Sequence, residues 1–541
     1  MSELSRTAIT RRALLGSATV AAAALALVGC GSEGAPAASD DATDVTPSEN
    51  DGSFACGFAS GATSLDPSSA TTPFAISANR NVVEGLYGLD PHDLTTFCEL
   101  ADGDPVQVDE TTFEVSLRAD ALFSDGSVVT PDDIAASFAR ANGDAEGWEA
   151  GVLSTMLAPI QSITRADDST VVVTTSVANF SLVRERLALL RVVPASSTRE
   201  EMDEKPVGSG PWKYSSVGTN SVTLVPNENY NGSFGNTGTE LTLRVTKDDD
   251  KRVSELLEAT TLACEAVPVS DVARLGDAGC VVDAVQGFSS RFLMFNVGRE
   301  PWGDVRVRQA VMYAINAQAM VDDLFDGHAV VPTSFVPEGY SCYHEAATVY
   351  GHDVARAREL LSEAGVVPGT IDLRVTDNSQ LKAMASQIKE DLDALGFNVV
   401  VTQDTSAATY AAIDRGDAYD LLLAAGDPSI FGYDADLLMR WWYGDGTWMR
   451  TRCPWYSSEE WVRLLQLMDQ ALAQSGAEQQ DTWNACLDLI AEQCVIYPVL
   501  QVQTITASWR DASASPKGRA LSGFSGIGSA GLDLLDATSV G

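Results

Sequence analysis

The fold is decided by residues 371–402, which read IDLRVTDNSQLKAMASQIKEDLDALGFNVVVT. A strand pattern over 371–375 is followed by a helical pattern over 380–395, and a second strand pattern covers 397–402. Gly396 separates the last two, and glycine fits the left-handed conformation that ends many helices. Strand, helix and strand in this order form a βαβ unit, which indicates a parallel sheet with covered faces. We therefore predict an α/β fold.

Further elements are predicted on the N-terminal side of this unit. A strand over 111–123 runs into the turn signal Asp125-Gly126, and a helix then starts with Thr130 as its cap and Pro131 in its first position. Another helix follows Asp304, with Arg306 and Arg308 on the face opposite its apolar residues. A helix over 353–364 is expected to stop at Gly365.

The first 52 residues are typical of an exported lipoprotein. Two arginines, Arg11 and Arg12, precede an apolar run over 13–28 that is too short for a membrane span and ends at Cys30. We interpret residues 1–29 as a signal peptide and Cys30 as the lipidation site, resembling the bacterial lipobox. The arginine pair resembles a twin-arginine signal, and an ordinary Sec signal stays open. Residues 30–52 are small and polar, which predicts a flexible tether. We expect anchoring to the outer face of the cytoplasmic membrane.

Size and charge restrict what the remaining chain can do. Residues 53–541 exceed what one hydrophobic core usually organises, so we expect at least two lobes. The chain has 35 basic and 75 acidic residues and a net charge of −40, which repels phosphate backbones. Nucleic acid is therefore excluded as a partner, and we expect a monomer.

Cysteine and histidine patterns give little support to a disulfide framework or a metal site. Eight cysteines follow Cys30, an even number that allows 105 pairings in an oxidising compartment, and we favour Cys264 with Cys280. The chain has four histidines and no Cys-x-x-Cys or His-x-x-x-His pattern, so we expect neither a metal site nor a cofactor.

A series of short motifs runs through nearly the whole mature chain in one order. It resembles the family 5 extracellular solute-binding proteins, the oligopeptide, dipeptide and nickel receptors of ATP-binding-cassette importers. The motifs are the segments 64–67 (SLDP), 83–87 (VEGLY), 123–126 (FSDG), 207–213 (VGSGPWK), 227–231 (NENYN), 304–310 (DVRVRQA), 313–316 (YAIN), 355–365 and 497–498.

The resemblance implies a bilobal periplasmic-binding-protein fold of the large class II type, which closes on its ligand by a hinge motion. Lobe I is then expected over 53–285 together with 505–541, and lobe II over 290–504. An extra subdomain is expected inside lobe I, at about 96–205. The implied function is to capture a small solute, most simply a peptide, and to deliver it to permease and ATPase subunits.

The same resemblance places the ligand between two strand-like segments, one in each lobe. The first is Thr71, Thr72, Pro73 and Phe74, where Pro73 cannot donate a hydrogen bond to a ligand. The second ends in Ala425, Gly426 and Asp427, where the family often has Gly-Trp followed three residues after the Trp by an Asp that holds a peptide amine. Asp427 is retained here and the Trp is missing. Nearby aromatic residues, expected to receive ligand side chains, are Tyr433, Trp441 and Trp442.

Rival functions stay open beside this prediction. Two Ser-x-x-Lys matches, at 379–382 and 386–389, lie within the predicted helix and lack a following Lys-Thr-Gly. The GxGxxG match at 526–531 lies too close to the end for a dinucleotide-binding unit. We expect no enzymatic activity, and an anchored hydrolase is the weakest alternative. A nickel or metallophore receptor and a surface lipoprotein that senses its ligand without transport are the stronger alternatives.

Overall fold

The computed structural model describes residues 51–92, 95–235, 238–524 and 532–541, so the predicted signal peptide, Cys30 and the GxGxxG match lie outside the described residues. The chain divides into two units, Met1–Pro47 and Ser48–Gly541, and everything below concerns the second. The βαβ prediction is confirmed. Strands β14 (Thr370–Val375) and β15 (Asn398–Gln403) pair in parallel and are connected by α11 (Ser379–Leu395), which ends at Gly396 with φ 112°.

The largest sheet of the described residues is mixed rather than parallel. Strand β14 pairs in parallel with both β15 and β16, and β1 pairs in parallel with β10 and β11, whereas β12 joins β16 and β17 in antiparallel fashion. The order is β15-β14-β16-β12-β17-β11-β1-β10-β9-β8, with β13 beside β17. The further bounds are β16 (Leu421–Gly426), β12 (Val281–Phe295), β17 (Ile496–Ser508), β11 (Ala263–Cys264), β1 (Ser53–Phe58), β10 (Glu240–Val245), β9 (Ser221–Pro226), β8 (Trp212–Val217) and β13 (Ala329–Val330).

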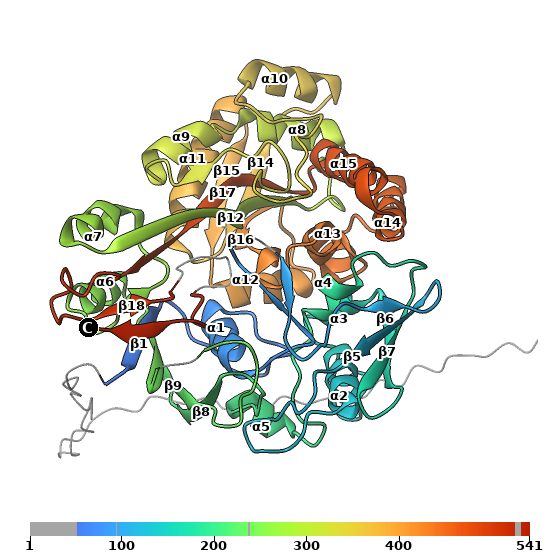
Figure 1. The fold of residues 1–541 in the computed structure, drawn as a ribbon. Helices are drawn as coiled ribbons and strands as arrows, with labels where there is room; N and C mark the ends of the chain where they lie inside the picture. Colours follow the sequence, from blue (N-terminus) through green and yellow to red (C-terminus); the bar gives the residue numbers. More distant parts are fainter. Residues whose placement is uncertain (1–50, 93–94, 236–237, 525–531) are drawn as a thin grey trace, which may run out of the picture. The chain divides into compact units, whose positions relative to one another are not determined.

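Two long strands, β12 and β17, run side by side through the middle of this sheet (Figure 1). Their register shifts between Gln286 and Ser290, so three residues of β12 bulge out of the ladder there. Such an irregularity bends a strand and increases its twist. One of the bulged residues, Phe288, is fully buried against the rings of Phe335 and Trp442.

Three smaller sheets complete the strands of the described part. Strand β5 covers only the first residues of the strand predicted over 111–123, while the predicted helix start is confirmed at α2 (Pro131–Asn142), with a capping box between Thr130 and Asp133. The four-stranded sheet has the order β4-β5-β7-β6, and the pairs are β2-β3 and β18-β19. Their bounds are β2 (Tyr87–Leu89), β3 (Thr96–Cys98), β4 (Val106–Gln107), β5 (Thr112–Ser116), β6 (Ile160–Arg165), β7 (Thr170–Thr175), β18 (Ala520–Ser522) and β19 (Thr538–Val540).

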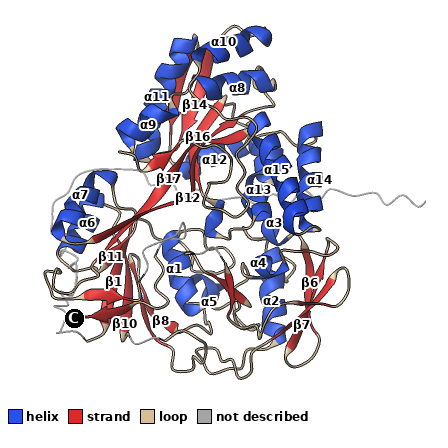
Figure 2. Ribbon diagram, turned by 45° about the horizontal axis from the view of Figure 1, so that its top comes forward, coloured by secondary structure: helices blue, strands red, loops and turns tan. Residues whose placement is uncertain are grey.

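The helices predicted after Asp304 and Asp353 are confirmed, and both aspartates cap them. Arg308, however, does not lie on an exposed face. It is 2% exposed, and its guanidinium donates to the carbonyl oxygens of Trp302 and Gln493, which makes burial of the charge tolerable. Figure 2 shows α8 (Val305–Ala314), α9 (Ala317–Leu324), α10 (Val354–Glu363) and α11 around strands β14 and β16.

The remaining helices connect and cover these sheets. They are α1 (Pro73–Val82), α3 (Ser154–Leu157), α4 (Val183–Leu187), α5 (Arg199–Glu204), α6 (Asp249–Leu257), α7 (Val272–Ala278), α12 (Ser406–Asp414), α13 (Ala435–Tyr443), α14 (Glu459–Leu472) and α15 (Gly476–Gln493), with the 3-10 helices η1 (Val269–Asp271) and η2 (Pro428–Ile430) and the π-helix η3 (Trp448–Arg452). Within the described ranges, none of the helices has the length and apolar character needed to span a membrane.

Buried apolar side chains form two clusters. One draws on residues 86–192 and 288–502, and the other on residues 54–83, 193–280 and 505–537. Along both β12 and β17 the buried and partly buried residues at one end belong to the first cluster and those at the other end to the second, so both long strands pass from one cluster to the other. The residues expected to form an inserted subdomain share a cluster with those expected to form lobe II. The lobe boundaries themselves stay a prediction.

The favoured pairing of Cys264 with Cys280 is not formed. The eight cysteines of the described chain are all free thiols, and all except Cys98 are buried. Cys264 lies on β11 beside β1, which carries Cys56, and its thiol interacts electrostatically with those of Cys56 and Cys280 without a bond to either. Burial raises the pKa of Cys280 to about 11, which keeps this thiol protonated and unreactive at neutral pH.

Candidate ligand-binding site

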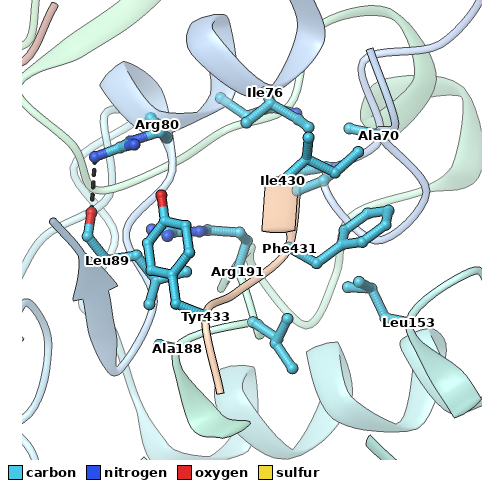
Figure 3. A pocket seen from close by; sticks show the side chains of 13 residues that line it. Ala70, Ile76, Arg80, Leu89, Leu153, Ala188, Arg191, Ile430, Phe431 and Tyr433 are labelled. Carbon is cyan, nitrogen blue, oxygen red and sulfur yellow. Dashed lines mark hydrogen bonds between the residues drawn. The ribbon is translucent and has the colours of Figure 1, made fainter. Parts of the chain in front are cut away.

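A pocket of about 610 Å³, including space open to solvent, lies where α1 meets the segment that follows β16. We call it the Arg80 pocket. Helix α1 contributes Ile76, Asn79 and Arg80, and the chain after η2 contributes Phe431 and Tyr433 (Figure 3). The pocket therefore joins residues that are about 350 positions apart in the sequence. Its other lining residues include Pro67, Ala70, Leu89, Leu153, Leu189, Arg191 and Ile430.

Helix α1 begins inside the first predicted ligand segment. Thr72 is the N-cap, its hydroxyl accepts a hydrogen bond from the N–H of Ala75, and Pro73 occupies the first helical position. The expectation of a strand-like segment here is therefore wrong, because a capped helix has no free strand edge for a ligand. Phe74 is buried with its ring against Phe58, and neither Thr71 nor Thr72 lines the pocket.

One face of α1 reaches the pocket. Ile76 and Arg80 are four residues apart and so lie above one another on the helix. Asn79 is committed elsewhere, since its amide donates to the Leu65 carbonyl and accepts from the Tyr214 hydroxyl. Arg80 is half-buried, and its Nη2 donates to the carbonyl oxygen of Leu89 at 2.8 Å (Figure 3).

Asp427 lies at the end of the second predicted segment, where β16 gives way to η2. Its Oδ1 accepts hydrogen bonds from the backbone N–H and the hydroxyl of Ser429, at 3.0 and 2.5 Å, so Asp427 caps the turn. It also faces Arg291, which pairs with Ala425 across β12 and β16. Burial lowers the pKa of Arg291 to about 10, and Asp427 opposes this change. The carboxylate is thus half-buried with a cation already beside it, and it does not line the Arg80 pocket.

The predicted aromatic residues divide into core and pocket. Trp442 is 1% exposed and packs against Phe288 and Phe292, so it belongs to the core. A side chain at Gly426 would collide with Trp442, since a Cβ there would lie 2.6 Å from the indole ring. Trp441 is half-buried and contacts Phe431, a pocket residue, at a ring distance of 5.3 Å.

Tyr433 is the predicted residue that lines the pocket. Burial raises its pKa to about 12, against the opposing charge of Arg80, so its hydroxyl stays protonated at neutral pH. Its ring lies at 6.2 Å from that of Tyr340, whose pKa burial and Asp427 raise well above the ordinary value. Tyr433 therefore connects the Asp427 region to the Arg80 pocket. Ala425 is exposed and does not line the pocket.

Sequence reasoning missed the arginines and the apolar residues of the pocket. Arg80 and Arg191 lie far apart in the chain, and Ile430 with Phe431 follows the predicted segment directly. The helical spacing of Ile76 and Arg80 was the available signal, but it requires knowing that α1 starts at Pro73.

The described residues offer no cluster suited to a metal ion. No group of three or more His, Cys, Asp or Glu side chains gathers within these ranges. His344 instead contacts Asp488 at 3.1 Å, and His328 contacts Gln503 at 2.8 Å. The two Ser-x-x-Lys matches lie along α11, where Lys389 pairs with Asp393 as an ordinary helical ion pair.

Comparison with known sequences identifies the type of protein. The profile of "Bacterial extracellular solute-binding proteins, family 5 Middle" matches residues 98–450. The glutathione-binding protein GsiB of Pectobacterium atrosepticum is 28% identical over 355 residues, which span 63% of this chain and 67% of that protein. For a relative of the same name from Salmonella, the matched part spans 60% of its length.

Solved structures share the fold. A dipeptide-binding protein from Pseudoalteromonas sp. SM9913, in complex with Met-Leu, has a TM-score of 0.74 at 18% identity, covering 90% of this chain and 99% of that one. NikA of Staphylococcus aureus, in complex with Ni(L-His)2, has a TM-score of 0.73 at 18% identity, with the same coverage. The predicted periplasmic-binding-protein fold is confirmed, and so is the prediction that the protein is not an enzyme, since this family binds solutes. The chain belongs to the family 5 bacterial extracellular solute-binding proteins.

Proposed function

We propose that this chain is the receptor of an ATP-binding-cassette importer, that it captures a small peptide in the Arg80 pocket, and that a lipid on Cys30 holds it at the outer face of the cytoplasmic membrane. The observation that carries the proposal is that α1 and the segment 430–433 meet around this pocket. A cleft formed by distant segments can close on a solute and open to release it.

The relatives' printed ligands support a peptide-like solute. Glutathione is a tripeptide, Met-Leu is a dipeptide, and both belong to proteins similar to this one. The pocket lining supports it too, since apolar side chains such as Ile76 and Phe431 alternate with hydrogen-bonding groups such as Tyr433. We propose that closure bends β12 and β17, because both strands pass between the two apolar clusters and β12 is already irregular there.

Titration calorimetry of the purified chain with Met-Leu and with reduced glutathione tests the proposal. We expect saturable one-to-one binding and recovery of the unaltered compound by mass spectrometry. Failure of both to bind would contradict a peptide receptor, and chemical conversion of either would contradict a binding protein. If a lipid on Cys30 anchors the chain, a Cys30→Ser variant should no longer associate with the membrane.

Asp427 is the residue we propose to influence a ligand amine. Its position beside Tyr433 and Arg291 makes it the acidic group that a bound ammonium would meet beyond the pocket wall. Asp427→Ala should weaken binding of Met-Leu by roughly tenfold or more, and binding of N-acetyl-Met-Leu should change little, because only the first has a charged amine. If the variant lost affinity for the two compounds equally, Asp427 would act only as the N-cap of η2 and would not contact a ligand amine.

A nickel receptor is the second candidate, and the structural likeness to NikA is the observation that favours it. With no cluster of metal ligands in the described ranges, nickel would have to arrive with its own ligands. Melting temperatures measured with Ni(L-His)2 and with Met-Leu separate the two, since the preferred solute stabilises the protein more.

A further inference from the structure

The charged side chains that line the Arg80 pocket are basic, whereas the chain as a whole is acidic. The sequence has more than two acidic residues for every basic one, yet the pocket is lined by two arginines and by no aspartate or glutamate. A low-dielectric wall strengthens the field of such a site, so the local sign of charge matters more than the net charge of −40. Asp90, Asp427 and Asp533 lie near enough to interact with Tyr433 but do not line the pocket, so the charged groups that a solute meets in the lining itself favour a carboxylate.

The two arginines of the pocket differ in what neutralises them. Arg191 forms an ion pair with Glu99, with 2.9 Å between Nη1 and Oε2, and both side chains are largely buried. Arg80 forms no ion pair with any described residue. Its single hydrogen bond within these ranges is the one to Leu89, so Nε and Nη1 have no protein partner there. Arg80 is thus the uncompensated charge of the pocket.

The groups next to Arg80 suit a carboxylate. In Figure 3 the hydroxyl end of Tyr433 points toward Arg80, with which Tyr433 interacts electrostatically. This hydroxyl has no hydrogen-bond partner among the described residues and can donate to an oxygen atom. A guanidinium binds a carboxylate through two parallel N–H···O bonds, which gives direction as well as strength. Arg291, a further cation outside the lining, already faces Asp427 and donates to Gln380 at 2.8 Å.

We propose that Arg80 binds a carboxylate of the solute, and that this protein therefore takes peptide-like compounds with a free carboxylate in preference to the same compounds with that carboxylate masked as an amide or ester. The inference rests on the proposed function and narrows its ligand class. The Tyr433 hydroxyl supports the same carboxylate, and the apolar wall formed by Ile76, Ile430 and Phe431 contacts the uncharged part of the solute.

The test compares ligands that differ only in the carboxylate. Calorimetry with Met-Leu against Met-Leu amide, and with glutathione against its diethyl ester, measures the preference for the free carboxylate. In the unmodified chain we expect the free acids to bind at least tenfold more tightly. In Arg80→Gln the ratio of the two affinities should fall to near one, because the free acids lose affinity while the amide and the ester keep theirs. In Arg80→Lys, which retains a positive charge but lacks the planar guanidinium, part of the preference for the free acids should remain.

The matched control is Arg415→Gln, which makes the same change of charge at a side chain that is 66% exposed and does not line the pocket. It should leave the preference intact. Equal binding of the free acids and of their amide or ester by the unmodified chain, or a preference for the acids that survives Arg80→Gln, would overturn this inference and leave the peptide receptor standing. Binding of none of the four compounds would overturn the proposed function and this inference with it. Melting curves of each variant identify any loss of fold.

Discussion

Two arginines of this acidic protein, Arg186 and Arg80, lie in surroundings that differ in how the charge is neutralised. Arg186 is fully buried, and its Nη2 lies 2.9 Å from a carboxylate oxygen of Asp434 and 2.9 Å from one of Asp436. Arg440 adds a second cation beside Asp436 and reaches Asp469. Arg80 has a carbonyl oxygen and open space. The difference teaches that the donors of Arg186 are used by two acids inside the fold, whereas Arg80 has no ion-pair partner among the described residues and keeps donors that face open space and can meet a ligand.

The pKa values of the two carboxylates around Arg186 depend on how many cations lie beside each of them. Burial alone would raise the pKa of Asp436, but the guanidiniums of Arg440 and Arg186 hold it below the ordinary value. Asp434 has a single such neighbour, and burial raises its pKa. Since the two acids come from the start of α13 and Arg186 comes from α4, this group connects α4 to α13.

The largest effect is expected from breaking this buried group. Arg186→Leu leaves Asp434 and Asp436 buried without their shared cation, and we expect the free energy of unfolding to fall by roughly 3–5 kcal/mol. Urea denaturation measures it, with the exposed Arg415→Leu as the control, where we expect a change below about 0.5 kcal/mol. A loss below about 1 kcal/mol in Arg186→Leu would mean that the ion pairs of Arg186 do little to stabilise the fold, and the contrast with Arg80 would fail.

A smaller effect is expected from a buried acid that lacks an ion pair. Glu265 is 6% exposed, its Oε1 accepts from the N–H of Ala59, and it has no ion-pair partner in the described ranges. Burial raises its pKa from 4.5 to about 7. Between these values the unfolded chain releases the proton and the folded chain keeps it, so stability contributed below pH 4.5 is lost as the pH rises through 7.

The measurement is the change in unfolding free energy between pH 4.5 and pH 8, for the unmodified chain and for Glu265→Gln. The unmodified chain should lose about 2–3 kcal/mol more than the variant over this range, because glutamine has no proton to release. The same pH dependence in both proteins would show that Glu265 does not carry the burial cost assigned to it, and would weaken the contrast with Asp436.

The fold could be predicted where local patterns decide it. The βαβ unit and the helix starts at Thr130, Asp304 and Asp353 are confirmed because caps and periodicity lie within a few residues of each other. Thr72 and Pro73 form the same Thr-Pro start as Thr130 and Pro131, so the local pattern indicates a helix at 71–74, where the family resemblance wrongly predicts a strand-like segment.

The site was harder to predict because its parts meet only in three dimensions. Tyr433 was predicted from its place among aromatics, and it lines the pocket. Trp442 shares that pattern and is core, because its ring covers Gly426. The sequence pattern predicts Arg308 on the wrong side of its helix and gives no signal for Arg80, because the partners of an arginine come from distant segments that a sequence does not pair.

The smallest expected effect is on the stability of the Arg80→Gln variant, and it completes the comparison. Arg80 donates one hydrogen bond, to Leu89, and a typical hydrogen bond contributes about 1 kcal/mol. Because the side chain is half-buried and water can replace the guanidinium at that carbonyl, we expect a loss below about 1 kcal/mol by urea denaturation without ligand. A residue that binds a solute contributes to affinity and little to the empty protein. A loss approaching that of Arg186→Leu would instead place Arg80 among the residues that hold α1 to β2, and the distinction between structural and ligand-binding arginines would fail.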